Sequence, residues 1–397
     1  MIYDAVIVGG GACGLMCAVQ AGYLGKKVLV LEKNDKAGAK ILISGGGRCN
    51  YTNLYAGPTN FLSQNEHFCT STLAQWTVDD TVNFFETNGI FGQEKTLGQL
   101  FPTSNKAKDV VSVFERLMKE LGQDLLMNSE VTAISQEETL LFNVHYRHLD
   151  RQETVQSRSV VMASGGLPIA KMGASDFSLK MARQFDLKVV PTAPALVPLT
   201  ITGKDAEWFG ALAGNSVFCK VSNEKISFEE NILFTHWGLS GPAILQISSY
   251  WRPGELITIN LLPHQDITSI IKEERQKGGK RLLLHVLQDL FTRKFADALG
   301  KYLPVDKKIA SMSKVEAQQV YQTIHHFQVK PAGDKGYDKA EVMRGGVDTE
   351  ELSSKSLEAL KCKGLFFGGE CVDVTGWLGG YNFQWAWASG YVIAQHI

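Results

Sequence analysis

The sequence predicts an α/β fold that is built from both ends of the chain and interrupted by an insert. Residues 1–32 read as a strand, a tight glycine turn, a helix and a second strand. From about residue 189 prolines and short alternating runs replace this pattern, and from residue 364 a strand followed by a helix returns. A chain that leaves an α/β domain and re-enters it is the simplest account of these three observations.

Length and composition exclude several classes of protein. The 397 residues are 44% hydrophobic, which is too much chain for one ordinary core and predicts two or three domains. A net charge of -1 and a pI of about 6.8 require neither a nucleic-acid nor a membrane partner. Seven scattered cysteines without a CxxC argue against a disulfide scaffold and a structural zinc site. We therefore expect no metal and a reducing, cytoplasmic location.

Neither end of the sequence reads as a targeting or membrane segment. The strand-like run Ala5–Val8 begins at once without a basic region before it, so we expect no signal peptide. The long uncharged stretch after Asp373 contains Asn382, Gln384 and several glycines. This stretch predicts a buried helix and its approach loop, and not a membrane span.

The first glycine cluster matches GxGxxG and lies between the first strand and a helix expected over 15–24. Gly9 permits the tight turn, Gly11 lets the backbone approach a pyrophosphate, and Gly14 allows close packing of helix on strand. Phosphates would bind at the helix N-terminus beside Ala12, where free N–H groups and the helix dipole favour an anion. The turn predicts a dinucleotide site.

An acidic residue in register strengthens this prediction. Glu32 follows the second strand, Val28–Leu31, eighteen residues beyond Gly14. A carboxylate there can accept hydrogen bonds from the ribose hydroxyls of an adenosine, and it disfavours the 2′-phosphate of NADP. The motif alone does not separate FAD from NAD.

A second glycine cluster follows within residues 33–60, which we expect to be a loop. Gly45, Gly46 and Gly47 are consecutive, and Lys40 and Arg48 add positive charge on either side. Such a backbone can wrap around a ligand with its N–H groups turned inward. Its position after the second strand predicts that it runs past a pyrophosphate toward a flavin ring; the alternative is a flexible surface loop.

At this point the sequence resembles the BaiN/RdsA (YhiN-like) family of NAD(P)/FAD-dependent oxidoreductases. The resemblance covers nearly the whole chain and rests on residues 6–14, 43–53, 234–245 and 368–390. It implies a glutathione-reductase-like FAD-binding Rossmann domain interrupted by an insert with an antiparallel, barrel-like part and a helical part. The expected boundaries are 1–188 and 338–397 for the FAD domain, 189–263 and 320–337 for the β part, and 264–319 for the helical part. Ser164 and residues 174–177 depart from the family pattern, which puts local contacts there in doubt.

The closing segment completes the expected flavin site. In such flavoproteins the acid at the end of the last strand binds the ribitol chain; Glu370 is the best match and Asp373 the reserve. A helix beginning near Tyr381 would point its N-terminus at N1 and O2 of the isoalloxazine. Trp385 and Trp387 are expected in the core. The candidate cofactor contacts in full are Gly9, Gly11, Ala12, Gly14, Glu32, Lys33, Lys40, Gly46, Gly47, Arg48, Cys49, Val131, Ala163, Gly165, Glu370, Asp373, Gly380, Tyr381, Asn382 and Phe383.

The electron donor and the substrate of the flavin are inferred partly by excluding alternatives and partly from the family resemblance. Cys13 and Cys17 lie on the first helix beside the phosphates, so a disulfide reductase is not expected. No second GxGxxG follows a strand, and the resemblance implies that NAD(P)H binds transiently at the flavin. The family is linked to reduction of activated C=C bonds, either uridine in large-subunit ribosomal RNA, giving dihydrouridine, or small enone-like molecules. A flavin-binding ribosome-associated factor without turnover is a third hypothesis.

Two residues are candidates for the general acid that such a reduction needs. Cys49 directly follows the glycine cluster, and His236 belongs to the 234–245 block; each could instead have a structural role. The helical insert favours the RNA hypothesis, because residues 264–314 hold eleven Lys/Arg and six Asp/Glu, a net of +5 against -6 for the rest. A solvated helical face is the alternative reading of that charge.

Overall fold

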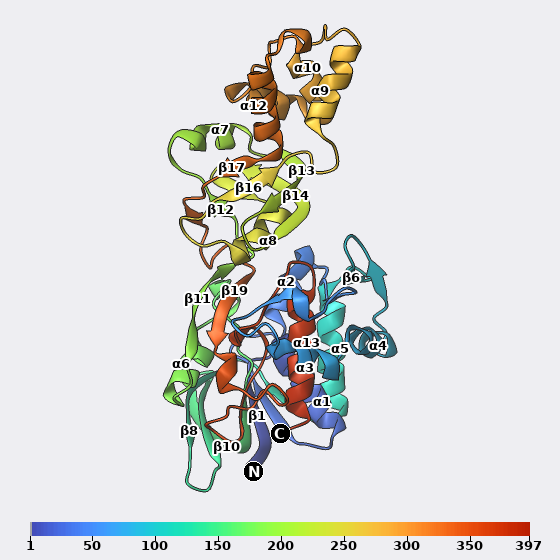
Figure 1. The fold of residues 1–397 in the computed structure, drawn as a ribbon. Helices are drawn as coiled ribbons and strands as arrows, with labels where there is room; N and C mark the ends of the chain where they lie inside the picture. The colour runs from blue at the N-terminus through green and yellow to red at the C-terminus, as the bar shows by residue number, and fades with distance from the viewer. Residues whose placement is uncertain (1) are drawn as a thin grey trace. The chain divides into compact units, whose positions relative to one another are not determined.

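The computed structural model describes residues 2–397 and divides the chain into two compact units (Figure 1). The first unit runs to Ala193 and resumes at Val342–Ile397, and the second is Pro194–Glu341. The α/β domain formed by both ends of the chain is therefore confirmed. The helical segment lies in the same compact unit as the antiparallel strands.

The main sheet of the first unit is parallel at its centre. Its order is β7-β2-β1-β10-β9-β8, with β20 also paired to β10, and the β8–β9 and β9–β10 pairs are antiparallel. The central strands are apolar on both faces, as expected for a sheet covered on both sides. The strands are β1 Ile2–Val8, β2 Val28–Leu31, β7 Asp124–Leu126, β8 Ser129–Gln136, β9 Phe142–His148, β10 Arg151–Met162 and β20 Leu365–Phe367.

Two helices that lie far apart in the sequence pack together in this unit, α1 Ala12–Tyr23 and α13 Tyr381–Ala394. Trp385 and Trp387 on α13 are buried as expected, and Trp387 stacks on Phe114 at a centroid distance of 5.4 Å. Phe114 belongs to the buried face of α5. The sequence predicts such a face, because Val110, Val113, Phe114, Leu117 and Leu121 recur at helical spacing. The remaining helices are α3 Phe68–Gln75, α4 Val78–Thr87, α5 Ala107–Glu120 and α6 Phe177–Gln184.

The expectation of a loop over 33–60 was wrong in part. Residues Ala39–Gly47 form α2, which is interrupted at Ser44 (φ -63°, ψ 146°). Gly45, Gly46 and Gly47 have φ of 55°, 69° and 81°, a left-handed stretch that disfavours any side chain. The glycines hid the short helical turn before them, because they remove the periodicity from which a helix is recognised.

A small antiparallel sheet follows α2 and was not expected from the sequence. Its order is β3-β6-β5, formed by Thr52–Asn53, Gln99–Pro102 and Gly92–Glu94. In Figure 1 the β6 label lies on a hairpin that projects from the edge of the first unit. Strands of two to four residues are too short to show alternation in the sequence. Two further short pairs are β4 Phe61–Leu62 with β21 Thr375–Gly376, and β11 Val189–Ala195 with β19 Val342–Val347.

The second unit contains the antiparallel sheet that the alternating runs predicted, in the order β17-β16-β13-β14-β15-β12-β18. The sequence predicts a helix N-cap at Ser240 with Pro242 in the first turn. The structure has Pro242 in the first turn of α8, Pro242–Tyr250, but its N-cap is Gly241. Ser240 is not the cap because it still pairs with Leu233 in the sheet. The strands are β12 Leu199–Thr200, β13 Ser216–Ser222, β14 Ser227–Thr235, β15 Gly238–Ser240, β16 Ile257–Asn260, β17 Phe327–Val329 and β18 Gly333–Asp334.

The hydrophobic spacing over 266–319 predicts helices, and the structure confirms them. Three of them, α9, α11 and α12, begin with a capping side chain, whereas α10 has none. Asp266 caps α9 and Ser313 caps α12, each by accepting a backbone N–H. No helix within residues 2–397 is both long and apolar enough to cross a membrane. The helices of this unit not yet given are α7 Ala206–Ala211, α9 Ile267–Gln276, α10 Leu283–Leu290, α11 Arg293–Ala298 and α12 Lys314–His325.

Candidate functional site

The GxGxxG turn lies where β1 ends and α1 begins. Gly9 has φ +108°, and a Cβ there would lie 2.6 Å from the carbonyl oxygen of Ala163. A Cβ on Gly14 would collide with the carbonyl oxygen of Gly9. Gly11 differs, because nothing lies within 4 Å of the position of its Cβ. Two of the glycines are therefore required by the fold, and the third leaves open space for a ligand.

The N-terminus of α1 faces that space without a competing group. Gly11 is the N-cap, no side chain caps the helix, and its first turn, which begins at Ala12, has no acidic residue. The first N–H groups of a helix have no intrahelical acceptor and carry the positive end of the dipole. This end of α1 can therefore hold a pyrophosphate.

Glu32 is positioned by backbone hydrogen bonds at the end of β2. Its Oε2 accepts from the Gly10 N–H at 2.7 Å and its Oε1 accepts from the Asn34 N–H at 2.8 Å. A carboxylate has about four lone-pair sites, so two remain for hydroxyl donors. The geometry is suited to a ribose beside the turn. Lys33, the neighbouring candidate, is exposed.

Glu370 lies just after β20 and is held from two sides. Its Oε2 accepts from Lys40 Nζ at 2.6 Å, and its Oε1 accepts from the Met343 N–H at 3.1 Å. A Cβ on Gly166 would lie 2.8 Å from Oε1, so the chain after β10 passes close to this carboxylate. Met343 was missed in the sequence, since a backbone contact of this kind has no residue signature.

Asp373, the reserve candidate, has a different environment. It is buried, and one of its oxygens accepts from the Gln64 N–H at 2.9 Å. Burial raises the pKa of this carboxyl above its usual value. The hydrogen bond ties the segment before α3 to the segment after β20, which is a structural role.

The glycines of α2 leave space on one side, because the Cβ position of Gly46 has no neighbour within 4 Å and that of Gly47 has only one, at 3.8 Å. Arg48 is fixed by a hydrogen bond from its Nε to the Gly45 carbonyl oxygen at 2.8 Å. Its guanidinium also lies over the ring of Phe101, 5.3 Å from the centroid. The open side of this segment is therefore formed by the glycine backbone.

The N-terminus of α13, like that of α1, has no capping side chain and no acidic residue in its first turn. Gly380 is its N-cap with φ +100°, and a Cβ there would collide with the Thr52 carbonyl oxygen. Asn53 Nδ2 donates to the Gly379 carbonyl oxygen at 2.8 Å. Asn53 thus fixes the approach to α13, which sequence reasoning missed because the contact joins residues 326 positions apart.

The side chains that open α13 are occupied within the protein. Asn382 Oδ1 accepts from the Gly376 N–H at 2.8 Å, and its Nδ2 donates to the Gly376 carbonyl oxygen at 2.9 Å. Phe383 stacks on Trp387 with centroids 5.6 Å apart, and Tyr381 is buried edge-on to Phe61. A cofactor at this helix end would therefore meet backbone N–H groups first.

The remaining candidates, Val131, Ala163 and Gly165, lie in the same first unit. Val131 lies on β8 immediately before a bulge, and Ala163 follows β10 with its N–H bonded to the Val8 carbonyl oxygen. Gly165 has φ +75°. The departure at Ser164 is compensated locally, because Ser164 Oγ and Ser178 Oγ are 2.6 Å apart and share a hydrogen bond.

The two candidate acids have contrasting surroundings. Cys49 has no exposed surface, has φ +60°, and its N–H donates to the Ser44 carbonyl oxygen. Burial raises the pKa of the Cys49 thiol to about 12, so it is protonated at neutral pH. His236 is exposed in the turn between β14 and β15 of the second unit.

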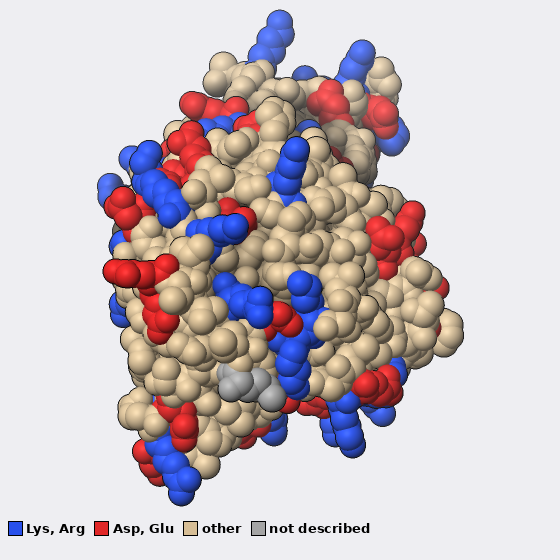
Figure 2. All heavy atoms as spheres, turned by 90° about the horizontal axis from the view of Figure 1, so that it is seen from below, with Lys and Arg blue, Asp and Glu red and all other residues tan. Residues whose placement is uncertain are grey.

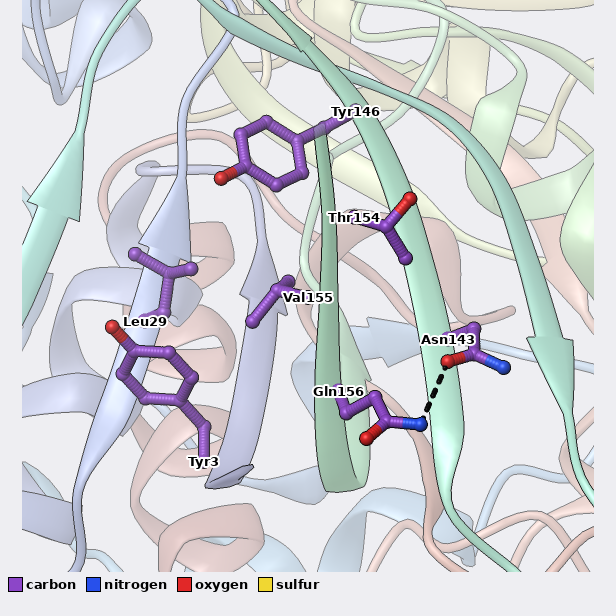
Figure 3. Close-up of a pocket in the computed structure, with 7 residues that line it drawn as sticks. All are labelled: Tyr3, Leu29, Asn143, Tyr146, Thr154, Val155 and Gln156. Carbon is purple, nitrogen blue, oxygen red and sulfur yellow. Dashed lines mark hydrogen bonds between the residues drawn. The ribbon is translucent and has the colours of Figure 1, made fainter. Parts of the chain in front are cut away.

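A hollow of about 580 Å³ lies elsewhere in the first unit (Figure 3). It is lined by residues of β1, β2, β9 and β10, including Tyr3 and Tyr146, and by Gln156, which donates to Asn143 Oδ1 at 3.1 Å. Burial and a hydrogen bond to Asp124 raise the pKa of Tyr3 to about 12. None of the candidate site residues lines this hollow.

The residues present fit FAD. They provide an open glycine turn at a helix N-terminus, a carboxylate beside that turn at the end of β2, a second carboxylate after β20 and an uncapped N-terminus of α13. The fold and this site define a flavin-dependent oxidoreductase of the Rossmann type. The chain belongs to the family described as HI0933-like protein Rossmann domain, whose model matches residues 3–396.

Curated relatives match over nearly their whole length. The chain is 43% identical to the "Ribosomal RNA dihydrouridine synthase" of Escherichia coli (strain K12) over 100% of this chain and 98% of that protein. It is 41% identical to the protein of the same name from Haemophilus influenzae, with 99% and 98% covered. A "3-dehydro-bile acid delta(4,6)-reductase" of Clostridium scindens is 27% identical over 98% of this chain and 97% of that protein.

Among solved structures, the 3-ketosteroid delta1-dehydrogenase of Sterolibacterium denitrificans superimposes with a TM-score of 0.52 at 13% identity. The superposition covers 100% of this chain and 99% of the dehydrogenase chain. The 3-ketosteroid-delta4-(5alpha)-dehydrogenase of Rhodococcus jostii RHA1 gives 0.50 at 12% identity, with 99% of this chain and 96% of that chain covered. At these identities the likeness shows a shared fold.

Proposed function

We propose that this protein binds FAD and uses NAD(P)H to reduce a uridine of ribosomal RNA to dihydrouridine. The observation that carries the proposal is the 43% identity over the whole chain to a ribosomal RNA dihydrouridine synthase. The target within large-subunit RNA, expected from the family resemblance, is part of the same proposal. The reaction saturates the C5–C6 bond of the base by adding one hydride and one proton.

Each part of FAD has a proposed partner in the first unit. The α1 N-terminus at Gly11 and Ala12 would bind the pyrophosphate, Glu32 the adenosine ribose, and the β8 backbone at Val131 the adenine. Glu370, oriented by Lys40, would bind the ribitol, and the N-terminus of α13 at Gly380 would face the pyrimidine end of the isoalloxazine. Bound FAD supplies the hydride, and the protein orients it and stabilises its charge.

The proton would come from Cys49 or His236. Cys49 is supported by its position two residues after the left-handed glycines, in the same segment as the proposed flavin contacts. This thiol is protonated at neutral pH, so its proton is present in that segment. His236 is supported by its exposure, which leaves its imidazole open to a bound substrate.

The helical insert is a proposed contact for RNA phosphates. Its eleven cations are divided, since Lys277, Arg281, Lys301 and Lys307 form ion pairs with carboxylates. Arg275 donates to the backbone carbonyl oxygens of Ile309 and Met312. Six others form no ion pair with any residue in 2–397 and can contact phosphate, namely Lys272, Lys280, Arg293, Lys294, Lys308 and Lys314.

A second candidate function is reduction of a small enone-like molecule, favoured by the 27% identity to a bile-acid reductase. Nucleoside mass spectrometry of ribosomal RNA, from cells with and without the gene, separates the two. Loss of one dihydrouridine that returns with the wild-type gene but not with Gly11→Val supports the RNA function. Unchanged dihydrouridine, with NAD(P)H oxidation by the purified protein on adding an enone, would establish the second. RNA binding without turnover on either substrate would favour a ribosome-associated factor.

A further inference from the structure

Two segments of the first unit carry cations and no carboxylates. Residues 36–65 contain Lys36, Lys40 and Arg48, and residues 95–108 contain Lys95, Lys106 and Lys108; neither contains Asp or Glu. Lys40 is paired with Glu370, whereas the other five form no ion pair with any residue of 2–397. The flanking carboxylates are Asp35, Glu66, Glu94 and Asp109.

The two segments contribute β3 and β6 to the β3–β6–β5 sheet, and β5 lies just before the second segment. We call this sheet and its flanking residues the platform: residues 48–55 and 91–106, in which Glu94 on β5 is the one carboxylate. Arg48 and Lys95 lie over the same buried ring, that of Phe101, at 5.3 and 4.1 Å from its centroid. Two like charges on one ring repel each other, and a bound polyanion would relieve that repulsion.

The platform also exposes large apolar side chains around its cations. Tyr55 is 65% exposed, Phe91 60%, Leu97 56% and Leu54 41%. Leu54, Tyr55 and Leu97 surround Gly98, because the Leu54 N–H donates to the Gly98 carbonyl oxygen and ring atoms of Tyr55 approach the same residue. A cluster of this kind on a soluble protein marks an interaction surface. Exposed rings beside cations are typical of proteins that bind single-stranded nucleic acid.

The platform is attached directly to the proposed flavin site. A Cβ on Gly45 would lie 2.8 Å from the ring of Phe101, so the left-handed glycines pack against β6. Gln99 on β6 lies beside Gly379, and Asn53 on β3 donates to the Gly379 carbonyl oxygen. A molecule bound on the platform would therefore lie next to the N-terminus of α13.

On the face shown in Figure 2, Lys and Arg side chains are interspersed with Asp and Glu, so this face offers a polyanion no continuous positive surface. We propose that the platform binds the unpaired RNA segment that carries the target uridine, with Tyr55 stacking on a base and Lys95 contacting a phosphate. This inference rests on the proposed function. An unpaired segment is required because a stacked, paired base cannot reach the flavin.

The test uses the flavin-loaded full-length protein and a fluorescein-labelled, uridine-rich single-stranded RNA, with binding followed by anisotropy over a range of salt concentrations. Tyr55→Ala and Tyr55→Leu should weaken binding about 10-fold or more with little change in salt slope, because stacking is lost. Tyr55→Phe should bind like the wild type. Lys95→Ala should reduce the salt slope by about one. All four should retain the wild-type flavin content and absorption spectrum.

Tyr23→Ala, which removes an aromatic 52% exposed at the end of α1, is the matched control and should bind RNA normally. The inference is overturned if the wild type binds RNA and makes dihydrouridine while Tyr55→Ala and Lys95→Ala bind as tightly as it does. Weakening by Lys280→Ala and Lys308→Ala alone would assign the docking to the helical insert instead. Failure of the proposed function has a separate signature, unchanged dihydrouridine in cells lacking the gene.

Discussion

Lys40 and Glu370 are joined by an ion pair of 2.6 Å although 330 positions separate them in the sequence. Lys40 lies in the first turn of α2 and Glu370 follows the last strand of the main sheet, so the pair connects the two halves of the interrupted domain. Both side chains are partly exposed, which limits the contribution of the pair to stability. Its consequence is that Glu370 is oriented before a cofactor binds.

Glu370→Ala should weaken FAD binding by about 1–3 kcal/mol, because one partly buried charged hydrogen bond to the ribitol is lost. The measurement is flavin fluorescence during titration of apoprotein with FAD. Asp373→Asn is the comparison variant and should alter affinity less, since Asp373 is engaged with the Gln64 backbone. Unchanged affinity in Glu370→Ala would move the ribitol contact to Asp373 or to another residue.

Gly11→Val should yield folded protein without flavin. The backbone at Gly11 is extended (φ -85°, ψ -169°) and its Cβ position is open, so valine fits the apoprotein but occupies the pyrophosphate space. Flavin absorbance and the circular dichroism spectrum of the purified variant measure the two properties. Gly14→Ala, whose Cβ meets the Gly9 carbonyl, should instead lower the melting temperature. A Gly11→Val protein with full flavin would show that the turn is structural only.

The flavin released from the wild type by denaturation should be FAD, because the first turn and Glu32 match a dinucleotide that carries an adenosine. Recovery of FMN alone would contradict the whole site.

Cys49→Ala should retain flavin and its reduction by NAD(P)H but stop product formation, because hydride transfer without a proton donor stalls. Stopped-flow absorbance of the flavin and mass spectrometry of the RNA product separate the two steps.

A second measurement concerns the wild-type thiol. Burial and a pKa of about 12 should protect the Cys49 thiol from alkylation in the native protein at pH 8. Wild-type dihydrouridine formation by Cys49→Ala would reject this assignment, and His236→Ala would then be the next variant to test.

Acid should destabilise the protein partly through Glu316. Hydrogen bonds from Lys307 and from the Ser313 cap lower its pKa from 4.5 to about 2. A carboxyl with a lowered folded-state pKa stabilises the fold above its unfolded pKa, and this stabilisation is lost as the pH falls from about 4.5 to 2. Glu316→Gln preserves the capping geometry. This variant should reduce the dependence of the melting temperature on pH between about 4.5 and 2. Glu224→Gln is the control, because Glu224 is exposed and forms no ion pair within residues 2–397. Its melting temperature should depend on pH as that of the wild type does. The same pH dependence in Glu316→Gln would contradict the assignment.

The sequence by itself determined the local parts of this protein. The GxGxxG turn, Glu32 at the end of β2 and the helix after Gly380 depend on residues close in the sequence, so their spacing predicts their geometry. The amphipathic face of α5 and the antiparallel strands of the second unit were likewise readable from periodicity. These features were sufficient to predict the fold class and the interruption of the domain.

Only the tertiary structure decided which distant segments meet. The pairing of Lys40 with Glu370, the attachment of Asn53 to Gly379 and the three short strands of the platform involve partners brought together by the sheet. Arg48 illustrates the difference: the sequence indicated a cation beside the glycine cluster, and only the fold shows that its guanidinium lies over Phe101. Chain spacing constrains a side chain only within a turn or a helix, and beyond that range packing decides its neighbours.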